Sequence, residues 1–211
     1  MTVTRISETK KGRFALFDEE DEFLFSVDGE TLHKHSIREG CALDGAALAA
    51  LRFDSDTRRA KDKALRFLAV RDHASGELYQ KLCRDFDEHS AAAAVAEMAR
   101  LDLLDDESFA CRYASQLAAR GKSVRQIAMK LEEKGIDRGA AQRALESVSE
   151  ACEGACLALV RRSYRAKLAA GQRDKVLAAL ARRGFSYGEA KDAVERVLTE
   201  LETESENGGM L

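Results

Sequence analysis

The hydrophobic positions of the chain follow two different periods. Residues 3–9, 13–17 and 23–27 are short, β-prone runs in which alternate positions share one face of a strand: Phe14 and Leu16 in one run, and Phe23, Phe25 and Val27 in another. Such alternation is typical of strands with one buried face. From residue 58 onward, apolar positions recur every three or four residues, as in amphipathic helices of roughly 10 to 17 residues. The pattern predicts a small antiparallel hairpin or three-stranded meander, followed by a helical region.

The helical region contains an internal repeat. Three apolar pairs, each with a four-residue separation, lie 49 residues apart along the chain: Leu78 and Leu82, Ile127 and Leu131, and Val176 and Leu180. Each pair is followed by a turn, a further apolar residue and another helical pattern. One such unit buries little apolar surface alone, so neighbouring repeats are expected to stack. We therefore expect Leu82, Leu131 and Leu180 to be core residues at equivalent positions.

Turn and capping residues agree with this periodicity. Gly135 and Gly184 stand where a helix would end in a left-handed residue. Ser123 and Ser186 each begin a capping-box pattern, and Asp106 can cap the helix that follows it. Each repeat therefore reads as three helices joined by short turns.

The N-terminal part forms a separate module in this interpretation. Asp28 can cap a short helix through Ser36, and Asp44 another through Arg52. Residues 53–57 look like a polar linker. The predicted fold is mainly α: three tandem three-helix repeats in an elongated array, preceded by a small α+β module with a β-hairpin. The predicted boundaries are 1–56 for the module, 57–104, 105–150 and 151–201 for the repeats, and 202–211 for a flexible acidic tail.

Composition supports a helical protein and conceals a segregation of charge. The 211 residues include no proline and no tryptophan, and aromatics make up 6%, which argues against an all-β fold. The formal net charge is −3, but residues 1–56 carry 7 basic and 12 acidic side chains. Basic residues concentrate in residues 58–71, 112–134 and 157–183. Because these stretches recur with the repeats, we expect them to form a positively charged ribbon.

The ribbon is the candidate binding surface of the chain. A stack of repeats aligns equivalent positions along one side, and such a face suits either a phosphate backbone or an acidic groove on another protein. The candidate binding residues are Arg66, Arg71, Arg120, Lys122, Arg125, Arg161, Arg162, Arg165, Arg182 and Arg183.

No group of residues indicates catalysis, a metal or a cofactor. His33 and His35 lie on different sides of a helix, and His73 and His89 fit solvated or capping roles. The acidic residues 102 and 105–107 fit helix caps better than a Mg²⁺ site. Nucleotide-binding glycine motifs are absent. We expect a protein that is not an enzyme and needs no metal or cofactor.

Five cysteines form no CxxC pair, and Cys152 and Cys156 share a helical face, as buried small hydrophobes would. The odd count, together with the lack of a signal peptide or a long apolar run, favours a reducing cytoplasm and no membrane partner.

Four stretches resemble the RecX family of bacterial regulatory proteins. They are residues 64–73 with Glu77-Leu78 and Lys81-Leu82, residues 101–110 with the pattern LLDD-x-x-FA, Arg120-Gly-Lys122 with residues 134–137, and residues 180–187. The resemblance covers almost the whole chain, and the LLDD pattern is its most specific marker. The chain departs from the family at residue 102, where aspartate replaces the usual glycine, and in a short connection at residues 167–173.

The resemblance implies a role without catalysis. RecX proteins bind the groove of the filament that the recombinase RecA forms on single-stranded DNA, and they inhibit ATP hydrolysis, filament growth and strand exchange. It thus implies a monomeric modulator of RecA in DNA repair, recombination and the SOS response, with weak contact to single- or double-stranded DNA. Because the helix pairs at residues 123–148 and 172–198 resemble helix-turn-helix units, a sequence-specific DNA-binding protein is the alternative.

Overall fold

The structure, a computed structural model, describes residues 1–208 of the chain, with side chains through residue 204. Its described part contains eleven helices and five strands. The chain divides into two compact units, one formed by Met1–His73 and Leu78–Leu104, the other by Ala74–Glu77 and the chain from Asp105 onward. The expected mainly α fold with a small N-terminal sheet is confirmed.

The first unit begins with the predicted strands. Strands β2 (Arg5–Glu8), β3 (Phe14–Phe17) and β4 (Phe23–Val27) form an antiparallel meander in that order. The two-residue strands β1 (Thr2–Val3) and β5 (Cys41–Ala42) pair separately. Helix α1 (Gly29–Lys34) follows, and the Asp28 carboxylate caps it by accepting from the Thr31 amide. Val3, Leu16, Val27 and Leu51 fill the core of this module.

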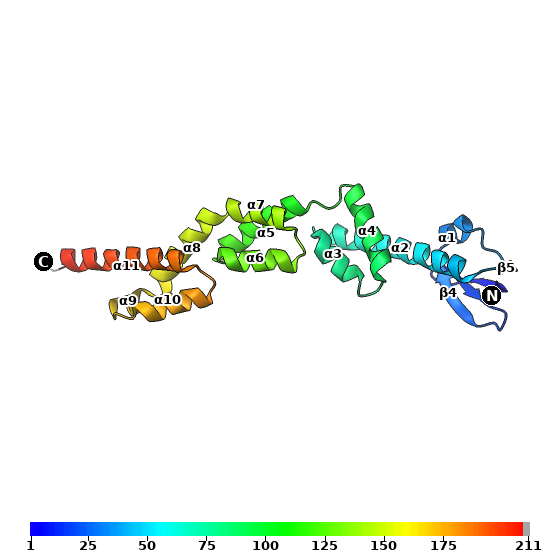
Figure 1. The fold of residues 1–211 in the computed structure, drawn as a ribbon, viewed down its shortest axis with the longest axis horizontal. Helices are drawn as coiled ribbons and strands as arrows, with labels where there is room; N and C mark the ends of the chain where they lie inside the picture. Colours follow the sequence, from blue (N-terminus) through cyan, green and yellow to red (C-terminus); the bar gives the residue numbers. More distant parts are fainter. Residues whose placement is uncertain (209–211) are drawn as a thin grey trace. The chain divides into compact units, whose positions relative to one another are not determined.

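Helix α2 corrects the expected linker. It runs without interruption from Gly45 to Val70, with its N-cap at Asp44, as Figure 1 shows. Leu51 packs into the sheet module, whereas Ala60 and Ala64 pack into the first repeat. The expected boundary between residues 56 and 57 therefore lies within a helix that both cores share.

The polar residues taken for a linker are explained by a contact across the module. Ser55 is buried, and its hydroxyl accepts a hydrogen bond of 3.0 Å from Nη2 of Arg13 on the sheet. A buried polar side chain with a partner is compatible with a helix interior. Neither glycine nor proline interrupts the helix after Gly45, so nothing local ends it.

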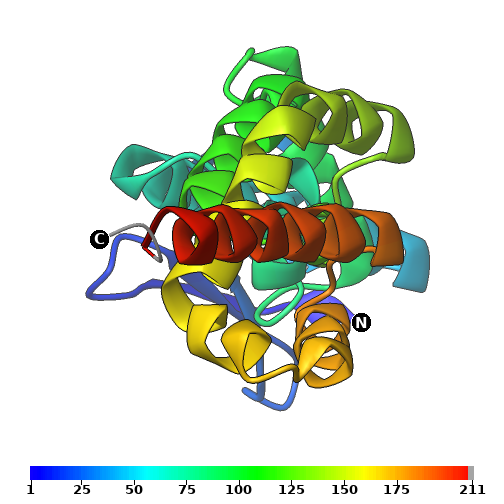
Figure 2. The same cartoon turned by 90° about the vertical axis from the view of Figure 1, so that its left-hand side faces the viewer.

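The three repeats have the predicted order of helices (Figures 1 and 2). The first repeat consists of the C-terminal half of α2, α3 (Ser75–Leu82) and α4 (Glu88–Arg100). The second has α5 (Asp106–Ala119), α6 (Val124–Glu133) and α7 (Arg138–Ser147). The third has α8 (Ser149–Ser163), α9 (Arg165–Ala169), α10 (Arg173–Arg182) and α11 (Tyr187–Gly208).

Two details of the third repeat differ from expectation. The repeat was expected to contain three helices, but its first helical segment is divided into α8 and α9 at Tyr164. Helix α11 includes residues 202–208, which were assigned to a flexible tail. Residues 209–211 of that tail lie outside the described residues.

The repeat register is confirmed by burial. Leu82, Leu131 and Leu180 are each 0% exposed, and so are their partners four residues earlier, Leu78, Ile127 and Val176. Phe185 and Ile136, after the turns, are also buried. The 49-residue spacing therefore marks equivalent core positions.

Several helix ends match their predicted residues. Gly135 and Gly184 adopt φ angles of 71° and 81°, the left-handed conformation that ends a helix at low cost in glycine. Ser186 and Glu189 form a complete capping box, with bonds of 2.7 and 3.2 Å. Asp102 has a φ of 54°, so aspartate adopts here the conformation that glycine favours.

The cap of α5 is a correction. Asp105, not Asp106, accepts from the Ser108 amide at 2.9 Å and caps this helix. The Asp106 carboxylate instead accepts from the Ser75 amide at 2.7 Å, at the start of α3. Asp106 therefore holds residues Ala74–Glu77 against the start of α5 within the second unit.

Two equivalent close contacts lie inside the second unit, and we call them the first and second joint. At the first joint, the start of α3 lies against the glycine that follows α6, and a Cβ built on Gly135 would lie 2.7 Å from the Cα of Gly76. At the second joint, the start of α6 lies against the glycine that follows α10. The Ser123 hydroxyl donates to the carbonyl of Arg183 at 3.1 Å, and a Cβ on Gly184 would lie 2.7 Å from that hydroxyl.

Truncating the central core leucine should destabilise the protein strongly. Leu131→Ala removes a side chain that is 0% exposed, so we expect a loss of roughly 2–5 kcal/mol in the free energy of unfolding. Met129→Ala, on the exposed face of the same helix, should cost less than about 0.5 kcal/mol. Chemical denaturation followed by circular dichroism measures both. Equal stability of the two variants would refute the repeat register.

The joint glycine can be tested against a glycine with the same backbone conformation. Gly121 and Gly135 have φ angles of 73° and 71°, but nothing lies within 4 Å of a Cβ at Gly121. Alanine at either position costs about 1–2 kcal/mol for the left-handed conformation. Gly135→Ala should cost a further ~1–3 kcal/mol, because its methyl group meets the backbone of Gly76. Equal denaturation midpoints for the two variants would show that the joint tolerates a side chain.

Candidate anion-binding surface

Five basic side chains gather at the second joint. Arg120 ends α5, Lys122 lies in the following turn, and Arg125 lies in the first turn of α6. Arg182 and Arg183 end α10. The bond between Ser123 and the Arg183 carbonyl holds these segments together, and the Cβ of Arg125 lies 3.7 Å from the Cβ position of Gly184. We call these five residues the joint cluster.

The joint cluster is exposed and unpaired. All five side chains belong to exposed residues, and none forms an ion pair with a carboxylate among the described residues. Arg120, Arg182 and Arg183 lie at helix C-termini, where the helix dipole favours cations. Arg125 lies at a helix N-terminus, where the dipole is positive, and the first turn of α6 carries no acidic residue. The surface there is therefore locally cationic.

At the first joint, by contrast, the basic side chain is paired with a carboxylate. There, Lys134 Nζ lies 2.7 Å from Glu77 Oε1, and these side chains are 25% and 12% exposed. At the second joint, Arg183 holds the position of Lys134, whereas Gln126 holds that of Glu77. Arg125 likewise replaces Gly76. Relative to the first joint, the second joint thus loses one negative charge and gains one positive charge.

Two other predicted binding residues, Arg161 and Arg165, form ion pairs with carboxylates of the same chain. Arg161 on α8 binds both carboxylate oxygens of Glu200 on α11, at 3.1 and 3.2 Å from Nε. Arg165 pairs with Glu200 and with Glu204. The hydrogen bond from Arg161 lowers the pKa of Glu200 below its usual range, so the carboxylate stays ionised. Arg162, in contrast, is exposed and has no ion pair in the described chain.

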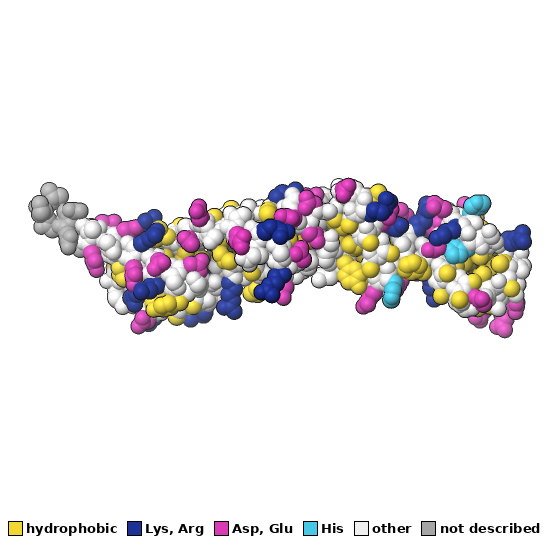
Figure 3. Space-filling view, turned by 45° about the horizontal axis from the view of Figure 1, so that its top comes forward, with side chains coloured by type: hydrophobic (Ala, Val, Ile, Leu, Met, Phe, Trp, Pro, Cys, Tyr) yellow, Lys and Arg dark blue, Asp and Glu magenta, His cyan; other side chains and the backbone are white. Residues whose placement is uncertain are grey.

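The remaining predicted residues lie in the first unit. Arg66 is exposed on α2, and Arg71 follows the end of that helix, where its guanidinium donates to the Asp72 carbonyl at 2.7 Å. On the face shown in Figure 3, basic side chains are interspersed with acidic ones over both units. The sequence showed where cations concentrate along the chain, but not which of them are neutralised.

His73 corrects an expectation of a solvated or capping residue. It is 4% exposed and packs against the Phe67 ring. Its Nδ1 lies 2.9 Å from the Arg71 carbonyl, and its Nε2 lies 2.8 Å from Nζ of Lys81. Because an ammonium group only donates, Nε2 accepts and Nδ1 carries the proton. His73 is therefore a neutral residue of the helix junction.

The other reactive side chains have structural roles. No three His, Cys, Asp or Glu residues in the described chain are grouped to hold a metal ion. Burial raises the pKa of Cys156 to about 11, with a smaller contribution from Glu189, and the thiol is inert as a nucleophile at neutral pH. Cys152 is also buried. None of the helices in residues 1–208 is long and apolar enough to cross a membrane.

The fold is that of a helical-repeat protein with a small N-terminal sheet, and comparison with known proteins specifies the family. Family models for the RecX first and second three-helix domains match residues 60–98 and 105–145. The regulatory protein RecX of Corynebacterium efficiens is 31% identical over 170 residues, which cover 74% of this chain and 81% of that protein. The RecX protein of Leuconostoc mesenteroides is 28% identical and covers 97% of this chain and 79% of its own length.

Solved structures show the same fold. A crystal structure of regulatory protein RecX matches with a TM-score of 0.64 and 21% identity, over 94% of this chain and 98% of that chain. RecX from Lactobacillus salivarius matches with a TM-score of 0.56 and 24% identity, over 70% and 97%. The chain belongs to the RecX family. It is therefore a regulatory protein and not an enzyme.

Restoring the missing carboxylate should neutralise the second joint. Gln126→Glu places at this joint the carboxylate that Glu77 supplies at the first, near Arg183 and the α6 N-terminus. We expect stability to rise by about 0.3–1 kcal/mol and elution from a heparin column to require less salt. The control is Gln80→Glu, at an exposed residue of α3, which makes the same change in net charge. Equal shifts in heparin elution for both variants would show that only net charge matters.

Proposed function

We propose that this protein regulates the recombinase RecA by binding RecA filaments on single-stranded DNA through the joint cluster. The observation that carries the proposal is a group of five exposed cations at helix ends and one turn, with no ion-paired carboxylate among the described residues. Membership of the RecX family supports RecA as the partner. A nucleoprotein filament presents both phosphates and protein carboxylates, and either kind of anion fits this surface.

Inhibition is the outcome we propose. A chain of several repeats contacts successive parts of a filament, and each contact raises the effective concentration of the next. A regulator bound across neighbouring RecA subunits restrains their movement during ATP hydrolysis. It thereby slows filament growth and strand exchange. The protein acts as a cytoplasmic monomer in DNA repair, recombination and the SOS response, and free single- or double-stranded DNA binds it only weakly.

Charge reversal of the joint cluster tests the proposal. The triple variant Arg120→Glu, Lys122→Glu and Arg125→Glu should lose filament binding and relieve ATPase inhibition in proportion, because the surface becomes anionic. The three residues are exposed, so folding should survive, with about 0.5 kcal/mol or less lost at each position. Cosedimentation with RecA filaments and RecA-dependent ATPase assays provide the readouts.

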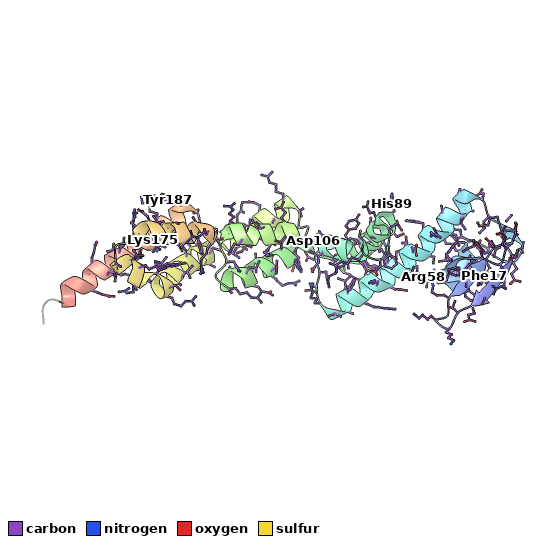
Figure 4. All side chains as sticks on the ribbon, turned by 90° about the horizontal axis from the view of Figure 1, so that it is seen from below. Phe17, Arg58, His89, Asp106, Lys175 and Tyr187 are labelled. Atoms are coloured by element: carbon purple, nitrogen blue, oxygen red, sulfur yellow. The ribbon has the colours of Figure 1, made fainter. Side chains whose placement is uncertain are left out.

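A matched control carries the same change in net charge away from the second joint. Arg138, Lys175 and Arg196 are exposed on α7, α10 and α11, and Figure 4 labels Lys175 on α10. Reversal of these three residues to glutamate should leave most inhibition intact. A folded joint-cluster variant that inhibits RecA as well as wild type would remove the cluster from the binding surface. Selective binding of one duplex sequence in gel shifts would favour the sequence-specific DNA-binding alternative.

A further inference from the structure

Helix α11 is longer than its counterparts in the other repeats. It has 22 residues, whereas α4 has 13 and α7 has 10. Val194 and Val197 hold the core positions of Leu145 and Val148 in the second repeat. The part of α11 beyond Thr199 therefore has no counterpart in the other repeats. Leu201 in this part packs against the core of the third repeat, but that packing does not account for the carboxylates of Glu200 and Glu204.

Two carboxylates of this extension form ion pairs with two arginines. Glu200 and Glu204 are four residues apart on α11, and Arg161 and Arg165 have the same spacing at the end of α8 and the start of α9. Arg161 binds Glu200 with its Nε and Nη2, and Arg165 binds Glu204 with Nη2, while its Nη1 lies 3.7 Å from Glu200. Helices α8 and α11 pack together along this contact (Figures 1 and 2).

The arrangement resembles the binding of a polyanion. Residues four apart on a helix are displaced by about 6 Å along its axis, so the two carboxylates form a short row of negative charge. The guanidinium fork matches the oxygens of a carboxylate and of a phosphate equally well. A pair of arginines that holds two carboxylates in a row is therefore suited to hold successive backbone phosphates.

We infer that Arg161 and Arg165 form a latent binding surface for the phosphates of single-stranded DNA, which the carboxylates of Glu200 and Glu204 occupy in the unbound chain. The inference rests on the proposed function in one respect: the single-stranded DNA of a RecA filament is taken as the anion that binds this surface. It adds a regulated site: α11 competes with DNA, so Arg161 and Arg165 contribute only after the extension is displaced.

The ion pairs are suited to exchange. In each ion pair one side chain is exposed and the other about one-third exposed: Arg161 is 52% and Glu200 32% exposed, and Glu204 is 66% and Arg165 33% exposed. Ion pairs that reach solvent are weakened by salt and contribute little to stability. The affinity of a protein for a nucleic acid, in contrast, rises with each phosphate that the protein neutralises, because condensed counterions are released. A DNA strand already held at another basic surface can therefore replace the two carboxylates.

Removing the two carboxylates tests the inference. The full chain with Glu200→Gln and Glu204→Gln should bind a fluorescein-labelled 30-mer of deoxythymidine about tenfold more tightly than wild type at about 0.1 M salt. Its plot of log affinity against log salt concentration should steepen by about 1.4, since two more phosphates are neutralised. The control Glu153→Gln with Asp192→Asn removes the same charge from residues without ion pairs in the described chain, and it should have a smaller effect and an unchanged slope. Fluorescence anisotropy measures both quantities.

A second pair of variants separates competition from a structural role. Arg161→Gln with Arg165→Gln should bind the oligonucleotide as wild type does, and in that background the glutamine changes on α11 should no longer raise affinity. If the ion pairs only fasten α11, the glutamine variant will melt earlier and bind no more tightly than the control, which overturns the inference. The single variant Glu204→Gln frees only one pair, and an intermediate gain is expected from it. Should the double variant be misfolded, the absence of any gain in this single variant overturns the inference.

The result is independent of the joint cluster. Loss of RecA inhibition on reversal of Arg120, Lys122 and Arg125, with no gain from the α11 variant, would support the proposed function and refute the latent surface. The converse result would retain the latent surface and refute the role of the joint cluster.

Discussion

The constraint on which the second unit depends is the close approach of one backbone to another at a left-handed glycine. Gly135 and Gly184 end the second helices of successive repeats, and the start of the preceding repeat's second helix lies against each of them. A side chain at either glycine would overlap a backbone or hydroxyl atom that also belongs to a helix start. Because both ends are fixed by their own caps, neither can move away cheaply. The spacing between repeats in this unit follows from that contact.

The two joints share their backbone geometry but differ in their charged side chains. Lys134 and Glu77 close the first joint with an ion pair. At the second joint, the Ser123 hydroxyl donates a hydrogen bond to the Arg183 carbonyl, and the side chain of Arg183 is exposed. The two segments of the second joint are thus joined by a hydroxyl and a carbonyl group, with no ion pair between them among the described residues. Substitutions at the rim can therefore alter binding without disturbing the repeat.

Much of the fold could be predicted because its signals are local. Apolar spacing identified Leu82, Leu131 and Leu180, and single residues such as Asp28, Ser186 and Gly135 identified helix ends. The errors arose where the conformation or the net charge at a residue depends on a partner far away in the sequence. The hydroxyl of Ser55 is satisfied by Arg13 on the sheet, so α2 continues through a polar stretch. Asp106 turns to Ser75, and Glu200 neutralises Arg161 from 39 residues away. A basic run in the sequence contains no information about such pairings.

A net charge of −3 is therefore compatible with binding to a polyanion. At physiological ionic strength, an exposed charge acts over about 8–10 Å, so an anion at the second joint experiences mainly the cations of the joint cluster. The same short range explains why the position of each carboxylate matters more than its number. Glu200 and Glu204 neutralise arginines on α8 and α9 directly, while the acidic residues of the sheet module contribute solubility. On the proposed function, selectivity for an anionic partner is thus set by which cations have no carboxylate partner among the described residues, and not by the total charge of the chain.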